Sequence, residues 1–290
     1  MNVGGPVRAA EASTVRGAAA HRDARGFQRT LLPDPGAGFL LQAVCDPYAV
    51  GATGAGPLVL AWNGTFWERE PLPALDPALS GAMLTGVSGR TAVGGAFDRL
   101  AAAETPLLLH RTAEGWAEEK APGAGFPYVL TGVHGDWAVG HGFPGTVVLR
   151  RGLSGWTSVA PPGPATRLLS VTSLDQYVWA GGERNGEGVL LLFDGRSWSE
   201  RRTRTGPVTT LAFWRGHAWA AAGRTLLQWT GRRWARHRIP LSVNALASSP
   251  AALYAAGAGE LGVYDGRRWD VRPLPGTWLG ADPRWLVGSA

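Results

Sequence analysis

The sequence predicts an all-β fold, a seven-bladed β-propeller with four-stranded blades whose closing blade is shared by the N- and C-termini. Glycine (42) and proline (21) together supply 63 of the 290 residues, which leaves little room for long helices. An apolar run that ends in tryptophan recurs along the chain, and two shorter motifs precede each copy. Units of about 40 residues that contain four short strands are typical of propeller blades.

The tryptophan-ending motif predicts the two outer strands of each blade. Six copies occur, and their final tryptophans are 49, 40, 42, 36 and 35 residues apart. Four copies place Asn-Gly, Asp-Gly or Thr-Gly before the tryptophan, and Asn-Gly or Asp-Gly between apolar runs is a strong hairpin signal. Each copy therefore reads as a strand, a turn and a second strand. The copies are Leu58–Trp67, Leu107–Trp116, Val147–Trp156, Leu190–Trp198, Leu226–Trp234 and Leu261–Trp269. We assign these tryptophans to packing between the sheets.

Two motifs upstream of each copy predict the inner strands. The second strands begin with an aromatic residue or Thr followed by Ala or Leu, and they are Tyr48–Gly51, Thr91–Gly94, Trp137–Gly140, Trp179–Gly182, Trp219–Ala222, Tyr254–Gly257 and Trp285–Gly288. The innermost strands are Leu41–Val44, Leu84–Val87, Leu130–Val133, Leu168–Val171, Val208–Leu211, Val243–Leu246 and Trp278–Ala281. Their second residue is uncharged and polar in five of seven copies. These residues either line a wet, neutral channel or hydrogen-bond to neighbouring blades.

The closing blade is predicted from both ends of the chain. The C-terminus supplies only the first two strands of a seventh unit, whereas residues 18–33 align without gaps on Leu107–Pro122, with Phe27 in the place of the tryptophan. Pairing these segments closes the ring and removes two unpaired sheet edges. We expect one propeller domain over residues 14–290 and a flexible tail over residues 1–13.

Charge, cysteine content and hydropathy narrow the class of protein. The formal net charge is +6, and Lys120 is the only lysine among 28 basic residues. The single cysteine, Cys45, excludes an intramolecular disulfide and a cysteine-based zinc site, and it permits a reducing compartment. No apolar run approaches the roughly 18 residues of a membrane span, and the N-terminus lacks the apolar core of a secretion signal. We expect a cytoplasmic protein that does not bind membranes.

The repeats resemble the tryptophan-rich propeller repeats of actinobacterial proteins, in which an Ala-Val-Gly strand precedes a run that ends in Asp-Gly-x-x-Trp. Thr91–Gly94 carries the first element, and Asp194–Trp198 and Asp265–Trp269 carry the second. The repeats are more distantly similar to the broad WD40, YVTN and BNR group of propellers. The resemblance covers roughly residues 14–288 and implies the fold. It implies no particular activity, because such propellers host unrelated functions.

The best candidate pocket lies on the face that we call the loop face, where the turns between second and third strands and the links between blades meet. His141 and Glu183 both directly follow second-strand glycines, so we expect them on this face in adjacent blades. Asp98 lies in the longest insertion, and the three are the candidate acid/base residues. The candidate ligand-binding residues are Arg99, Glu104, Phe126, Tyr128, Phe143, Arg184 and Glu187.

The opposite face, which we call the turn face, receives the hairpin turns and a predicted basic arc. Residues 201–290 hold 13 arginines against 4 acidic residues. We expect the arc to lack interleaved exposed aromatic residues, which disfavours nucleic acid as a partner. The arc consists of Arg196, Arg232, Arg233, Arg267 and Arg268.

Two classes of function remain open. The first is a binding or scaffold propeller that holds a small ligand or a protein partner on its loop face, and the lack of a catalytic motif favours it. The second is a small-molecule enzyme, such as a lyase, cyclase or hydrolase of secondary metabolism, that uses Asp98, His141 and Glu183. No metal-ligand spacing and no phosphate-binding loop is present. We therefore expect no metal and no cofactor, and we expect a monomer.

Overall fold

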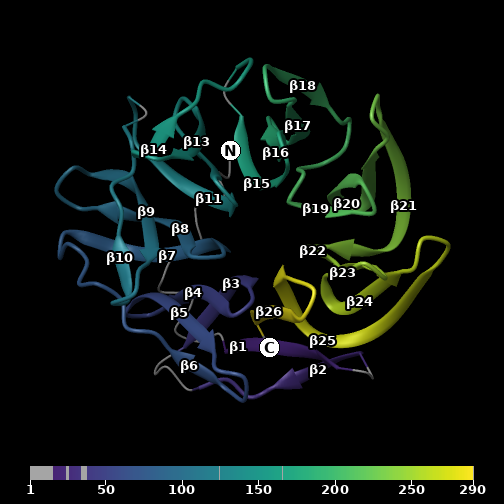
Figure 1. The fold of residues 1–290 in the computed structure, drawn as a ribbon, viewed down its shortest axis with the longest axis horizontal. Helices are drawn as coiled ribbons and strands as arrows, with labels where there is room; N and C mark the ends of the chain where they lie inside the picture. The colour runs from purple at the N-terminus through teal and green to yellow at the C-terminus, as the bar shows by residue number, and fades with distance from the viewer. Residues whose placement is uncertain (1–15, 24–25, 34–37, 124, 165, 290) are drawn as a thin grey trace.

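Short antiparallel strands surround a central axis in the computed structural model (Figure 1), which describes residues 16–23, 26–33, 38–123, 125–164 and 166–289. Twenty-six strands, β1 to β26, and no helix occupy these residues. The fold is therefore an all-β propeller, as predicted. Residues 1–13, for which we expected a flexible tail, lie outside the described residues. Within the described part, no helix is long and apolar enough to cross a membrane.

Four sheets contain the predicted four strands. In each sheet the strands follow one another in order from the central axis to the outer rim. The first contains β3 (Phe39–Cys45), β4 (Tyr48–Thr53), β5 (Gly56–Trp62) and β6 (Trp67–Arg69). The second contains β7 (Leu79–Ser88), β8 (Thr91–Asp98), β9 (Ala103–Arg111) and β10 (Trp116–Glu118). The third contains β11 (Tyr128–His134), β12 (Trp137–Gly142), β13 (Thr146–Gly152) and β14 (Gly155–Ser158). The fourth contains β15 (Arg167–Leu174), β16 (Tyr177–Arg184), β17 (Glu187–Phe193) and β18 (Trp198–Arg202).

The predicted count of seven separate four-stranded blades is not confirmed, because the other strands form one sheet of three strands and one of seven. The three-stranded sheet contains β19 (Thr210–Trp214), β20 (His217–Trp229) and β21 (Trp234–Val243). β20 pairs with β19 through its first residues and with β21 through its later ones, so one long strand takes the place of two.

The seven-stranded sheet joins the two ends of the chain. It contains β22 (Ala245–Ser248), β23 (Leu253–Ala256), β24 (Ala258–Tyr264), β25 (Trp269–Ala281), β26 (Trp285–Ser289), β1 (Gly17–Asp23) and β2 (Gly26–Thr30). β25 is one continuous strand that pairs with β24 on one side and with β26 on the other. The sixth blade and the closing blade, which we expected as two separate sheets, are therefore joined into one. β1 pairs with β26 from Gly17 opposite Ser289 to His21 opposite Trp285, so the predicted pairing of N- and C-terminal strands is present.

The core lies between neighbouring sheets, where Ala, Val and Leu side chains pack around tryptophans. The repeated tryptophans Trp67, Trp116 and Trp156 are buried, as expected. Trp198, Trp234 and Trp269 are only partly buried. The outer strands of these later blades therefore leave part of the indole surface at the rim.

The glycine that ends the second-strand motif is required by a β-bulge in the innermost strand. A Cβ atom on Gly51, Gly94, Gly140, Gly182 or Gly288 would lie 1.9 to 2.0 Å from a carbonyl oxygen of the adjoining innermost strand. In each of these five pairs the register shifts by one residue at the second position of the innermost motif. β19 pairs with β20 without such a shift, and Ala222 stands at the corresponding position.

The bulge residues bind the next blade. The Oγ1 atom of Thr85 donates a hydrogen bond to the carbonyl oxygen of Leu130 at 2.9 Å. Thr131 repeats this contact one blade further, with the carbonyl oxygen of Leu168 at 2.8 Å. Of the two interpretations of these polar residues, Thr85 and Thr131 therefore support hydrogen bonding between blades.

Candidate functional site

A hollow of about 850 Å³ opens on the loop face between the first and second sheets. It is lined by the turn between β4 and β5, the link between β6 and β7, and the start of β7. Leucines and prolines make up much of this lining, and a few charged side chains join them. The lining includes Leu72, Leu75, Asp76 and Leu79. Arg99 is the only one of the predicted site residues that lines it.

The link between β6 and β7 is held open by prolines and by Arg99. Three prolines within residues 71–77 remove backbone donors, so this segment does not continue as a strand. The guanidinium group of Arg99 donates to the carbonyl oxygens of Pro77 and Ala78. Arg99, a predicted ligand-binding residue, thus braces one wall of the hollow.

Asp98 closes the turn of the predicted insertion. Its Oδ1 atom accepts hydrogen bonds from the backbone N–H groups of Leu100 at 2.8 Å and Ala101 at 3.0 Å. This turn leaves the Leu100 side chain 87% exposed. Glu104 lies directly opposite Phe97 on the neighbouring strand β9. The insertion therefore displays apolar side chains, while the carboxylate of Asp98 is engaged by its own loop.

His141 and Glu183 come together through Arg167, a residue that the sequence analysis did not select. The Nε atom of Arg167 donates to Nε2 of His141 at 3.3 Å, and its NH1 atom pairs with Oε1 of Glu183 at 3.2 Å. Arg167 is the first residue of β15 and lies opposite Glu183 in the register of β16. The sequence places Arg167 directly before the predicted innermost strand Leu168–Val171, but this position alone does not show which side chains it contacts. Among the described residues, no hydrogen bond or ion pair joins Asp98 to this cluster.

The environment of His141 keeps its imidazole neutral at pH 7. Burial, and then the positive charge of Arg167, lower the pKa of His141 from 6.5 to about 4. The unfolded chain binds this proton below about pH 6.5, whereas the folded protein does not until about pH 4. The contribution to stability is therefore present above pH 6.5 and is lost as the pH falls toward 4.

An NMR pH titration of the histidines tests this assignment. We expect His141 to titrate near pH 4 and Arg167→Gln to raise its pKa only in part, because the burial persists. Titration of His141 near pH 6.5 in the wild-type protein would contradict the buried geometry.

The predicted aromatic residues differ in their exposure. Tyr128 is buried, its hydroxyl donates to the carbonyl oxygen of Pro122 at 2.5 Å, and burial raises the pKa of Tyr128 to about 12. Phe126 packs against the backbone of Gly145, where a Cβ atom would lie 2.0 Å from the ring. Phe143 is 91% exposed and is thus the aromatic candidate that a partner can reach.

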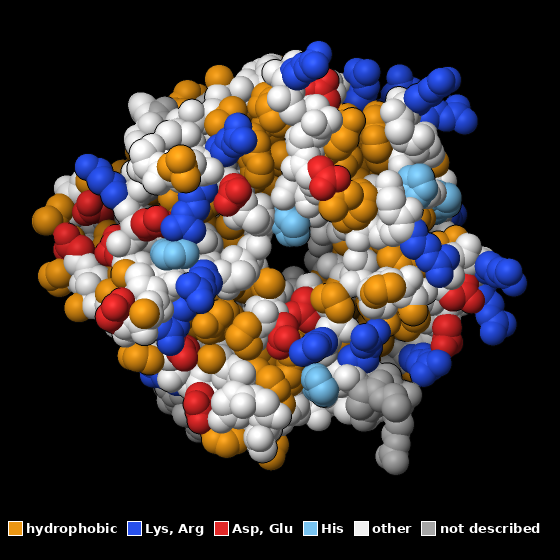
Figure 2. Space-filling view, in the orientation of Figure 1, with side chains coloured by type: hydrophobic (Ala, Val, Ile, Leu, Met, Phe, Trp, Pro, Cys, Tyr) orange, Lys and Arg blue, Asp and Glu red, His pale blue; other side chains and the backbone are white. Residues whose placement is uncertain are grey.

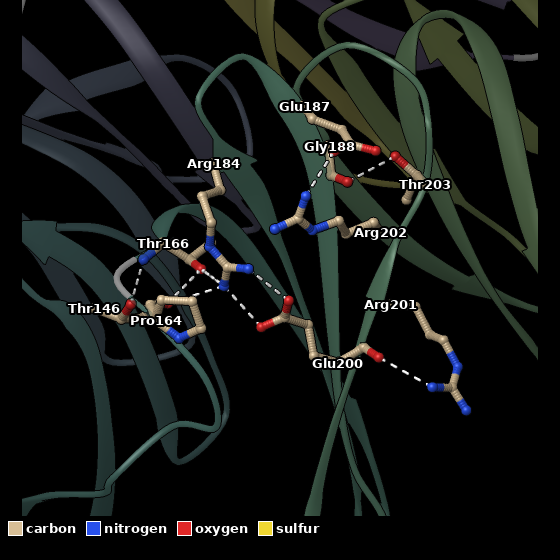
Figure 3. A network of polar contacts seen from close by, with 10 residues as sticks. All are labelled: Thr146, Pro164, Thr166, Arg184, Glu187, Gly188, Glu200, Arg201, Arg202 and Thr203. Atoms are coloured by element: carbon tan, nitrogen blue, oxygen red, sulfur yellow. Dashed lines mark hydrogen bonds and ion pairs between the residues drawn. The ribbon is translucent and has the colours of Figure 1, made fainter.

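Arg184 and Glu187 make contacts within their own blade and its link to the third sheet (Figure 3). NH1 and NH2 of Arg184 bind the two carboxylate oxygens of Glu200 at 2.6 and 2.7 Å. NH2 also donates to Oγ1 of Thr166 at 2.6 Å. Glu187 pairs with Arg202 at 3.4 Å. Arg184 thus anchors the link before β15 to the outer strand β18.

Exposed apolar side chains lie on both faces. On the turn face they are Phe66, Leu153, Leu174 and Tyr177, and on the loop face they are Leu31, Phe97, Leu100 and Phe143. Leu31 and Phe143 are each 91% exposed, and Phe97 is 45% exposed. Together with Leu100, they project from the segment after β2 and from the turns of the second and third sheets. Within the described ranges, no cluster of three or more His, Cys, Asp or Glu side chains could hold a metal ion.

The comparisons with known proteins place the chain among β-propellers. No family model matches the sequence, and no curated protein matches it. The structure of U3-55K aligns with a TM-score of 0.62 at 11% identity over 85% of this chain and 86% of the other. The RRP9 WD40 repeats align with a TM-score of 0.61 at 11% identity over 85% and 84%. Apo AztD from Citrobacter koseri aligns with a TM-score of 0.53 at 11% identity over 95% and 98%.

At these identities the likeness establishes the fold alone: the chain is a β-propeller with WD40-like structural neighbours.

Proposed function

We propose that this chain is a binding propeller that holds a protein partner on its loop face. The observation that carries the proposal is the open 850 Å³ hollow on the loop face, a face that also exposes Leu31, Phe97, Leu100 and Phe143. Open hollows with a largely apolar lining are typical of binding sites. WD40-like neighbours are consistent with such a role.

The placement of the charged candidates favours binding over catalysis. Acid/base chemistry needs two or three titratable groups that converge on a substrate. The carboxylate of Asp98 closes its own turn, and Glu183 is paired with Arg167. We therefore propose that Arg167, His141 and Glu183 hold the third and fourth sheets together beneath the binding face.

We also propose seven blades within one domain over residues 14–290. β25 pairs with β24 from Trp269 to Pro273 and, after a register shift, at Thr277, whereas it pairs with β26 from Thr277 to Ala281. Gly276, at the change of partner, has a φ of 123°. The seven-stranded sheet then counts as two blades that share β25. A monomer in the cytoplasm, related to the tryptophan-rich repeat group, fits the repeat pattern and the single Cys45.

Selection from a random peptide library tests the loop face. Peptides selected on the wild-type protein are expected to bind Leu100→Asp/Phe143→Asp at least about tenfold more weakly, because burying one such side chain contributes about 1.5 to 3 kcal/mol. The matched control is Phe66→Asp/Leu153→Asp, which changes exposed side chains in hairpin turns on the turn face.

The control variant is expected to bind the selected peptides within about twofold of the wild type. Failure to enrich any peptide, or an equal loss of binding in both double variants, would reject the loop face as the binding surface.

A further inference from the structure

A second recess, which we call the basic groove, lies at the rim between the fourth sheet and the three-stranded sheet. It has a volume of about 220 Å³. Five arginines line it: Arg201, Arg202, Arg232, Arg233 and Arg236. Basic side chains gather at this rim, beside β18 and the turn before β21 (Figure 2). No acidic residue is part of the lining.

The strand register gives the groove an apolar side. Trp229 lies opposite Trp234, and Leu227 lies opposite Arg236, in the pairing of β20 with β21. All four side chains line the groove, and the two indole rings lie 5.5 Å apart. The expectation that the basic arc lacks aromatic neighbours is therefore wrong for Arg232 and Arg233. Partly exposed indoles next to guanidinium groups suit a ligand that is both anionic and partly apolar.

The positive charge of the groove is only weakly compensated. Arg201 and Arg236 donate to the backbone carbonyl oxygens of Glu200 and Thr203, which carry no net charge. Arg202 pairs with Glu187 at 3.4 Å, but the Arg202 side chain is 59% exposed and the pair is screened by solvent. Arg232 and Arg233 have no carboxylate partner in the described part of the chain. Anionic groups are therefore the chemistry that complements this surface.

Two features favour an acidic peptide over a nucleic acid. β18 is the outermost strand of its sheet, so its free edge can pair with an extended segment. The recess is small, about 220 Å³, and its lining includes no residue of the blade after the three-stranded sheet, so it does not form the long track that a polynucleotide follows. In an extended peptide every second side chain points to the same side, which brings alternate carboxylates toward the arginines.

We propose that the basic groove binds an extended acidic segment of a partner protein. The carboxylates of this segment meet Arg232, Arg233 and Arg201, and its intervening residues contact Trp229 and Trp234. The groove opens at the outer rim, apart from the loop face, so it is a second interaction surface. It does not depend on the function proposed above.

Fluorescence anisotropy with a labelled peptide of alternating Glu and Thr tests this proposal. We expect Arg232→Gln/Arg233→Gln to weaken binding about tenfold, through the loss of two charge contacts. The matched control is Arg267→Gln/Arg268→Gln, which removes the same charge from the same turn one blade further and outside the groove. It is expected to change the affinity less than about twofold. A peptide of alternating Gln and Thr is expected not to bind.

The same measurement includes single-stranded oligothymidylate of equal net charge. Tighter binding of the oligothymidylate than of the Glu peptide, with loss in the Arg232/Arg233 variant, would replace the peptide with a nucleic acid and overturn the proposal. Equal weakening by both arginine pairs would show diffuse attraction to a basic protein, which also overturns it. So would the absence of peptide binding. Leu100→Asp/Phe143→Asp is expected to leave this affinity unchanged, which separates the two surfaces.

Discussion

Replacing Trp285 with Ala is expected to lower the free energy of unfolding by about 4 kcal/mol, because it leaves a large cavity where the chain closes. Trp285 is completely buried, and its ring lies 4.6 Å from that of Trp67 and 4.8 Å from that of Trp62. Its Nε1 atom donates to Oδ1 of Asp46 at 3.2 Å. The side chain therefore joins β26, in the closing sheet, to the first sheet.

Urea unfolding followed by circular dichroism gives the free energies for this prediction. Trp285→Phe keeps an aromatic ring but loses the hydrogen bond to Asp46. It should therefore lower the free energy of unfolding by about half as much as the Ala variant. The control is Trp269→Ala in the outer part of β25, where the indole is only partly buried. If Trp285→Ala lowers the free energy of unfolding no more than Trp269→Ala does, the prediction is wrong. Packing between β26 and the first sheet then does not dominate the stability of the propeller.

Replacing Arg184 with Met is expected to lower the free energy of unfolding by about 3 kcal/mol, the lower end for a buried ion pair that loses one partner. The side chains of Arg184 and Glu200 are only 9% and 21% exposed. The variant leaves the Glu200 carboxylate without the two-pronged contact shown in Figure 3 and removes the anchor of Thr166. The link before β15 should loosen as a consequence.

The control for Arg184 is Arg202→Met in the same sheet. The pair of Arg202 with Glu187 is exposed, so its loss should cost less than about 1 kcal/mol. Equal costs for the two arginine variants would contradict the anchoring role of Arg184.

The pH dependence of stability provides a second readout for the same pair. The hydrogen bond and charge of Arg184 hold the pKa of Glu200 below its ordinary 4.5. The stabilisation that the Arg184–Glu200 pair provides is therefore complete above pH 4.5. It is lost as the pH falls through the lower pKa that Glu200 has in the folded protein. Glu200→Gln should remove this part of the acid sensitivity.

Several features of the fold follow from local sequence alone. The period of the apolar runs and the Asp-Gly and Asn-Gly turns predicted strand after strand in the right order. Asp194 and Asp265 illustrate the reason, because each accepts two backbone N–H groups within its own turn. A turn of this kind depends on four neighbouring residues and on nothing further along the chain.

The sequence did not predict how the strands divide into sheets, because two long strands, β20 and β25, continue where the repeat pattern predicts that a strand ends. Gly223 and Gly276 have positive φ angles within β20 and β25, and hydrogen bonding continues past them. The motif pattern marks these points as ends of strands. Hydrogen bonds between strands decide whether a sheet is divided there, and a repeat pattern does not record them.

The candidate site was predicted in part. The equivalent positions of His141 and Glu183 in successive repeats indicated that they lie on one face. Arg167, which joins them, and the pair of Arg184 with Glu200 depend on side chains that meet across strands and blades. Spacing along the chain does not specify which side chain extends far enough to make such a contact.

By itself, the sequence determined the β-propeller class, the order of the strands and the pairing of the two ends, because apolar periodicity, turn residues and unpaired edges are properties of short segments. Only the tertiary structure decided which surfaces can bind. The open hollow beside Leu72, and the groove that the indoles of Trp229 and Trp234 line together with five arginines, arise where separate sheets meet. The physical reason is that a groove is made by the distance and angle between neighbouring sheets, which are set by packing across the whole ring.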